Sequence, residues 1–195
     1  MSSAAKTYVT PEQYLEMERQ AERKHEYDRG RIIAMPGASR EHNLIAVNIM
    51  SELWNQLVER PCEAYAGNMR VRLGEGGPYV YPDVVVVCGE PRFEVEGGVD
   101  TLQNPTLIVE VLSPSTEGRD RGRKSRVYRA LPSLRHYVMV AQDEVLVEHY
   151  RRVDGKWEPS ELVDIDATLR LESVDCELPL RRVYAKVAFP ETPPV

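Results

Sequence analysis

Hydrophobic residues follow two kinds of spacing along the chain, and each predicts a different kind of element. From Glu41 to Glu59 they recur every fourth position, which places them on one face of an amphipathic helix that Pro61 ends. Runs at 80–88 and 106–112 are rich in valine or isoleucine and apolar on both faces, as expected for central strands of a sheet. The pattern predicts a helix packed on a β-sheet.

The first part of the chain predicts a small addition ahead of this core. Thr10, Pro11 and Gln13 carry the signature of a helix N-terminus with a capping box, so a charged helix to about Arg23 should follow. A strand or hairpin is expected over 27–35, where a turn precedes a pair of isoleucines.

The middle of the chain predicts strands, turns and one further helix. A strand is expected over 65–73, a turn over 74–78 and a loop over 89–105. Residues 119–131 have helical spacing, and 135–140 is again extended. The order strand, helix, strand is typical of an α/β fold.

The last part of the chain predicts β-structure. A hairpin is expected over 144–157, with its turn at Asp154 and Gly155. Residues 168–174 alternate between apolar and polar, as in a half-buried strand.

Length and composition fit one globular α/β domain. The chain has 195 residues, of which 42% are apolar and 29% charged. Within the domain at 1–195 we expect an N-terminal addition at 1–40, a core at about 41–150 and a β extension at 151–195. No apolar run approaches the roughly 18 residues of a membrane span, and the first residues do not resemble a targeting signal. We therefore expect a soluble, cytoplasmic protein without a membrane partner.

The cysteines indicate neither a disulfide framework nor a zinc site. Cys62, Cys88 and Cys176 are odd in number, far apart and without a CxxC pair, so three buried free thiols are expected. The four histidines also lack the spacing of zinc ligands, and none is assigned to a metal.

Two carboxylates stand where a purely structural strand would not place them. Asp83 precedes the valine run, and Glu110 lies inside the strand expected over 106–112. A buried carboxylate without a partner costs several kcal/mol, so each must be paired, exposed at a strand end or bound to a cation. If their strands are neighbours, the two side chains offer the oxygen ligands that suit Mg²⁺ or Mn²⁺. A structural ion pair or a capping role is the alternative.

The net negative charge of the chain argues against DNA binding by the surface as a whole, but one segment is basic enough to bind DNA. The formal net charge is −6, whereas phosphate binding depends on lysine and arginine. The segment around Lys124 is nonetheless basic, and its arginines are Arg119, Arg121, Arg123, Arg126 and Arg129. It predicts a patch that binds nucleic acid beside Glu110, or simply the solvated face of a helix.

Several segments, in order along the chain, resemble a known family. They are 24–30 (KHEYDRG), His42 at a helix start, 81–84 (YPDV), 107–116 (LIVEVLSPST), and Asp120 with Lys124 and Tyr128. Together, over roughly 10–150, they resemble the putative restriction endonuclease family of bacterial proteins, within the PD-(D/E)XK nuclease superfamily. The resemblance implies a restriction-endonuclease-like mixed central sheet flanked by helices.

The resemblance also implies a metal-dependent endonuclease that hydrolyses phosphodiester bonds in DNA. Asp83 and Glu110 would hold Mg²⁺ or Mn²⁺, and the Val111 carbonyl would add a ligand. The ion would activate water and stabilise the charge that develops on the phosphate.

The chain departs from the superfamily at its usual lysine position, which Leu112 occupies. In the family that it resembles, a lysine on the following helix takes this place, which makes Lys124 the catalytic candidate. A helical ion pair between Asp120 and Lys124 is the alternative. Glu26, His42 and Asp120 would support the site indirectly; strand-end pairing or helix capping is the alternative for Glu26 and His42.

Two other functions remain open. The missing strand lysine and the acidic charge are compatible with a degenerate nuclease fold that binds nucleic acid or a partner protein without cleaving it. An ordinary structural domain would instead keep Asp83 and Glu110 in separate ion pairs. A homodimer is implied only by resemblance to restriction-type enzymes, because a duplex presents two strands.

Overall fold

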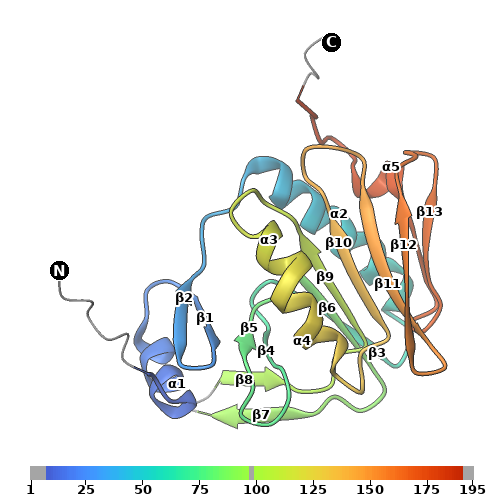
Figure 1. Cartoon of the computed structure of the whole chain (residues 1–195). Helices are drawn as coiled ribbons and strands as arrows, with labels where there is room; N and C mark the ends of the chain where they lie inside the picture. The colour runs from blue at the N-terminus through green and yellow to red at the C-terminus, as the bar shows by residue number, and fades with distance from the viewer. Residues whose placement is uncertain (1–7, 97–98, 191–195) are drawn as a thin grey trace.

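The computed structural model describes residues 8–96 and 99–190, and its centre is a six-stranded mixed sheet (Figure 1). The strand order is β12-β11-β10-β9-β6-β3, in which β9 and β10 are parallel and the other neighbours antiparallel. The strands are β3 (Cys62–Ala66), β6 (Val84–Cys88), β9 (Leu107–Val111), β10 (His136–Val140), β11 (Val147–Val153) and β12 (Lys156–Leu162). Every residue of β9 is buried, which confirms a strand covered on both faces.

One face of this sheet is covered by α2 (Arg40–Leu57), an 18-residue helix capped by Ser39. Its apolar stripe is Ile45, Ile49, Leu53 and Leu57, which pack in one core cluster with alternate residues of β6, β9 and β10. The helix predicted from four-residue spacing is therefore confirmed. No helix in the described part of the chain is long and apolar enough to cross a membrane.

The other face is covered by a helical segment in three parts. These are α3 (Glu117–Arg119), the π-helical segment η1 (Asp120–Lys124) and α4 (Ser125–Arg129). Tyr128 and Leu131 join the second core cluster, which contains the remaining alternate residues of the central strands. A π-helical turn changes the direction of the side chains that follow it, and such turns are frequent at functional sites.

A second sheet lies beside the first, and it carries the N-terminal elements (Figure 1). Its order is β2-β1-β5-β4-β8-β7. The strands are β1 (His25–Asp28), β2 (Arg31–Ala34), β4 (Arg70–Arg72), β5 (Tyr79–Val80), β7 (Phe93–Glu96) and β8 (Val99–Leu102). The helix α1 (Pro11–Gln20) has the predicted capping box at Thr10, and its Tyr14 packs against two tyrosines of this sheet.

Three predicted segments differ from the structure. Two segments predicted as single strands are each divided between the two sheets, and one predicted loop contains a pair of strands. The strand expected over 65–73 is split into β3 and β4, which belong to different sheets. The strand expected over 80–88 is split into β5 and β6 around Pro82, which has no N–H to donate to a ladder. The loop expected over 89–105 contains the β7–β8 hairpin.

The C-terminal part forms the predicted hairpin and a small sheet. The β11–β12 hairpin turns at Asp154 and Gly155, which both have positive φ. A two-stranded sheet of β13 (Thr168–Leu171) and β14 (Cys176–Pro179) follows, and α5 (Leu180–Val183) is the last helix or strand of the described residues.

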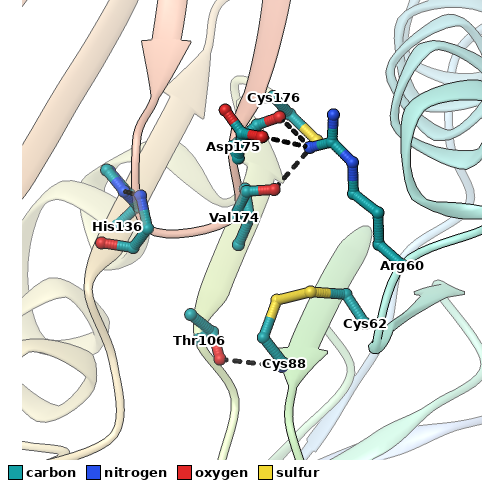
Figure 2. Close-up of a disulfide and its surroundings, with 9 residues drawn as sticks. Arg60, Cys62, Cys88, Thr106, His136, Val174, Asp175 and Cys176 are labelled. Carbon is teal, nitrogen blue, oxygen red and sulfur yellow. Dashed lines mark hydrogen bonds and ion pairs between the residues drawn. A yellow bond between two sulfur atoms is a disulfide. The ribbon is translucent and has the colours of Figure 1, made fainter.

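A disulfide joins Cys62 and Cys88, so the prediction of three free thiols is wrong for two of them (Figure 2). The two cysteines are direct cross-strand partners on β3 and β6, a register that their spacing in sequence does not reveal. Cys176 is free and buried, as predicted.

Reduction of this disulfide is expected to lower the free energy of unfolding by about 2–4 kcal/mol, because the bond closes a loop in the unfolded chain. The linked residues are 26 positions apart. Urea unfolding with and without reductant measures the effect. The unfolding free energy of the Cys62→Ala variant should not change with reductant. If the unfolding free energy of the wild type does not change either, the disulfide does not stabilise the fold.

Candidate functional site

Asp83 and Glu110 meet at one place because β6 and β9 are antiparallel neighbours. Val84 pairs with Val109, so Asp83, just before β6, lies opposite Glu110 on β9. Both line a pocket of about 130 Å³. The charged residues of this pocket are Glu26, Asp83, Glu110, Asp120, Arg119 and Lys124. The two carboxylates therefore line one pocket, although each has its own partner there: His42 for Asp83 and Lys124 for Glu110.

Asp83 is held by one backbone and one side-chain partner. The Val111 N–H donates to its Oδ2 at 2.7 Å, and His42 Nε2 lies 2.9 Å from its Oδ1. His42 comes from the first turn of α2, where its own N–H donates to the Ser39 cap. The structure therefore brings His42 and the Val111 N–H to Asp83, whereas the family resemblance implied a role for the Val111 carbonyl.

Glu110 is the buried carboxylate of the pair. Its Oε1 accepts from the Tyr128 hydroxyl at 2.6 Å and lies 2.7 Å from Lys124 Nζ. Burial, reinforced by the nearby Asp120 and Asp83, raises the pKa of Glu110 to about 8, although Lys124 acts in the opposite direction.

This raised pKa predicts a pH dependence of stability in the metal-free protein. The ordinary value is 4.5 and the folded value about 8, so between them the folded protein holds a proton that the unfolded chain has lost. The contribution of Glu110 to the free energy of unfolding should therefore be lost as the pH rises through this window. Glu110→Gln removes the titrating group. With chelator present, the free energy of urea unfolding should fall less in the Glu110→Gln variant than in the wild type as the pH rises from 4.5 to about 8. An equal fall in both proteins would show that Glu110 does not cause the pH dependence.

Lys124 is held among three carboxylates at the end of the π-helical segment η1. Its Nζ lies 2.7 Å from Glu110 Oε1, 3.0 Å from Glu26 Oε1 and 3.5 Å from Asp120 Oδ1. The helical pair with Asp120 is thus present, but it is the longest of the three contacts. The ammonium group is directed at Glu110, whose side chain lies on the face of the sheet that the helical segment covers.

Glu26 connects the N-terminal sheet to this pocket. It is buried on β1 and pairs with Lys124 and with Arg119. The Tyr81 N–H also donates to its Oε1 at 3.4 Å. Glu26 therefore neutralises and orients two cations of the helical segment.

The predicted basic patch is largely paired with carboxylates of this chain. Arg121 contacts Glu117 and Glu148, and Arg123 contacts Asp28. Arg126 is exposed, and no described residue forms an ion pair or hydrogen bond with its side chain. Ion pairs at a surface contribute little to stability, so these carboxylates hold Arg121 and Arg123 only weakly.

The sequence matches a family model over residues 11–181, and the description of that family is putative restriction endonuclease (Uma2). The chain belongs to this family. Two uncharacterized proteins of Synechocystis sp. are also similar. One, sll1609, is 36% identical over 87% of this chain and 96% of its own length. The other, slr1290, is 35% identical over 93% of this chain and 94% of its own length.

The fold of this Uma2 protein is similar to that in a crystal structure of a putative nuclease from Anabaena variabilis. The TM-score is 0.75 at 20% identity, and the match covers 92% of this chain and 99% of the other. The restriction-endonuclease-like α/β fold expected from the sequence is thereby confirmed.

The pocket of this family member has the charge and donors of a divalent-ion site, although its carboxylates are not gathered around one point. Among the described residues, no three histidine, cysteine or acidic side chains are grouped as ready-made metal ligands. Four carboxylates and two cations nonetheless line the pocket, which leaves two negative charges when all are ionised. Oxygen donors with this excess charge fit Mg²⁺ or Mn²⁺.

Tyr128 is a residue of the site whose role sequence reasoning did not recognise. Its helical spacing suggested a core residue, and it is indeed fully buried in the second core cluster. Its hydroxyl, however, is bonded to Glu110. The available signal was chemical: a buried tyrosine needs a hydrogen-bond partner.

Proposed function

We propose that this protein is a Mg²⁺- or Mn²⁺-dependent endonuclease that hydrolyses phosphodiester bonds in DNA. The observation that carries the proposal is the convergence of Asp83, Glu110 and Lys124 in one pocket. Membership of the putative restriction endonuclease family supports the same reaction class.

In this proposal the two carboxylates hold the ion, and the Val111 carbonyl adds a ligand. The bound ion supplies a Lewis acid that activates water and stabilises charge on the phosphate. Asp83 is oriented for this task by the Val111 N–H and by His42. Glu110 is oriented by Tyr128 and Lys124.

Lys124 is the proposed replacement for the lysine that the strand lacks at Leu112. Its ammonium group is positioned by Glu26 and Asp120 and can neutralise the charge that develops on the phosphate, or polarise the attacking water. The lysine therefore reaches the site from η1 rather than from β9.

The proposed DNA contacts lie along the helical segment next to the pocket. Arg119 lines the pocket itself, and Arg121, Arg123 and Arg126 follow it along the chain. Because phosphate binding releases counterions, affinity through these residues should fall steeply with salt. We further propose, from the resemblance to restriction-type enzymes alone, that a homodimer acts on duplex DNA; sedimentation of the purified protein tests this.

A nuclease assay with and without divalent ions tests the function. Purified protein should nick supercoiled plasmid DNA in Mg²⁺ or Mn²⁺ and not in chelator, and titration calorimetry should detect binding of the ion. Glu110→Gln should lose cleavage, whereas Glu177→Gln, at an exposed carboxylate of β14, should keep it. RNA and single-stranded DNA assayed in parallel test the assignment to duplex DNA. Absence of both cleavage and ion binding would refute the proposal.

A degenerate nuclease fold that binds DNA without cleaving it is the second candidate. Leu112 at the usual lysine position and the formal net charge of −6 are compatible with it. It predicts that the wild type binds DNA but never cleaves it, and that the affinity survives Asp83→Ala and Glu110→Ala.

A further inference from the structure

Tyr128 lies behind the pocket and contacts two residues of its lining: it donates a hydrogen bond to Glu110, and Lys124 Nζ lies 5.8 Å from the centroid of its ring. The side chain is fully buried on α4 and is not part of the pocket lining. Its hydroxyl donates to Glu110 Oε1 at 2.6 Å, the same oxygen that Lys124 contacts at 2.7 Å. The described residues place no hydrogen-bond donor on the other oxygen of Glu110.

Packing fixes the position of this hydroxyl. The rings of Tyr128 and Tyr137 lie 5.1 Å apart between centroids, and both belong to the second core cluster. The Tyr137 hydroxyl in turn donates at 3.1 Å to the carbonyl of Asp120, where η1 begins. The two tyrosines thus link β10, η1 and α4 to the carboxylate of β9.

The partner of Tyr128 sets it apart from three other buried tyrosines of the fold. Tyr81, which is also buried, donates to a carboxylate as well, but at 3.3 Å and to Glu18, which does not line the pocket. Tyr14, Tyr27 and Tyr184 donate their hydroxyls to backbone carbonyls, at His25, Val9 and Leu146 respectively. Such bonds satisfy a buried hydroxyl and serve packing alone. Tyr128 instead donates to the carboxyl group of Glu110, which lines the pocket, and such a hydrogen bond becomes stronger when the carboxyl group is ionised.

We propose that Tyr128 is a positioning residue, which holds Glu110 so that its second oxygen stays available to a divalent cation. The inference rests on the proposed function, because it concerns the same ion site. Lys124 and Tyr128 share one oxygen of the carboxylate, and a rigid tyrosine restricts rotation of the carboxyl group more than a flexible lysine can. Partners that orient a metal ligand in this way typically contribute about 10–100-fold in metal affinity.

Mn²⁺ titration calorimetry on Tyr128→Phe tests this role. The substitution removes one oxygen and retains the packed ring, so the variant should fold and bind Mn²⁺ about 10-fold more weakly. Tyr184→Phe is the matched control, because it also removes a buried tyrosine hydroxyl, and it should bind Mn²⁺ like the wild type. Thermal unfolding of both variants without the ion separates a loss of affinity from a loss of folded protein.

A second comparison uses Glu110→Gln as the background. If Tyr128 acts through Glu110, adding Tyr128→Phe to this variant should cause no further loss of Mn²⁺ affinity. Equal affinities of Tyr128→Phe and the wild type would overturn the inference and leave the proposed function intact. Equal losses in Tyr128→Phe and Tyr184→Phe would also overturn it, because a general loss of packing would then explain both. A wild type that binds no divalent ion would overturn the proposed function and this inference together.

Discussion

Replacing Lys124 with methionine is expected to lower the rate of DNA cleavage by about 10²–10³-fold, the usual effect of removing one group that stabilises developing charge. The ammonium group lies 2.7 Å from Glu110 and 3.0 Å from Glu26, inside the pocket. Methionine keeps much of the length and apolar stem of lysine without its charge. Single-turnover cleavage with saturating enzyme and Mg²⁺ isolates the chemical step from DNA binding.

Two controls make this result interpretable. Lys156→Met, at an exposed lysine of β12, should leave the rate unchanged. Lys124→Met should also be less stable by about 3–5 kcal/mol, because it leaves buried carboxylates without their cation. Rates must therefore be compared at temperatures where urea unfolding shows the variant to be folded. A folded Lys124→Met protein with an unchanged rate would favour a purely structural ion pair.

Asp83→Asn is expected to remove cleavage and to weaken ion binding by more than the about 10–100-fold typical of residues that only orient a ligand. Asparagine fills the same space but lacks the negative charge that a divalent cation requires of its ligands. Titration calorimetry with Mn²⁺ gives the affinity directly. Asp143→Asn, at an exposed aspartate outside the pocket, is the matched control. If the Asp83→Asn variant binds Mn²⁺ as tightly as the wild type does, Asp83 is not a ligand of the ion.

The parts of the fold that follow one repeating pattern could be predicted from the sequence. The four-residue spacing of Ile45, Ile49 and Leu53 specified the helix α2 and its buried face. The two-faced apolar run of β9 specified a central strand. These patterns are local, because the spacing of apolar residues that identifies a helix or a strand can be recognised within that element alone.

The breaks between sheets and the disulfide could not be predicted in this way. Residues 65–73 have the sequence pattern of a single strand, yet a turn at 67–68 separates β3 from β4, and the two strands pair with strands distant in sequence. The pairing of Cys62 with Cys88 depends on the register of β3 against β6. Register is set by tertiary packing, which leaves no signal in the spacing of two cysteines.

In the site, too, residues could be identified from their local sequence, whereas contacts between distant segments could not. A carboxylate inside an apolar strand identified Glu110 as unusual from the residues alone, whereas Lys124 became a candidate only through family resemblance. The contact of Lys124 with Glu26 joins residues almost 100 positions apart and depends on the docking of the N-terminal sheet. The arginine-rich segment predicted either a patch that binds nucleic acid or the solvated face of a helix. In the structure, carboxylates from other strands, Asp28 and Glu148, pair with two of its arginines.

A crystal structure determined with Mn²⁺ would show, through the anomalous scattering of the ion, whether Asp83 and Glu110 hold one cation between them. We expect one strong peak in the pocket, within about 2–2.5 Å of carboxylate oxygens of both side chains, the range expected for oxygen ligands of such cations. Lys124 should remain beside Glu110. A peak away from Asp83 and Glu110, or no peak in crystals saturated with Mn²⁺, would show that these carboxylates do not form the ion site.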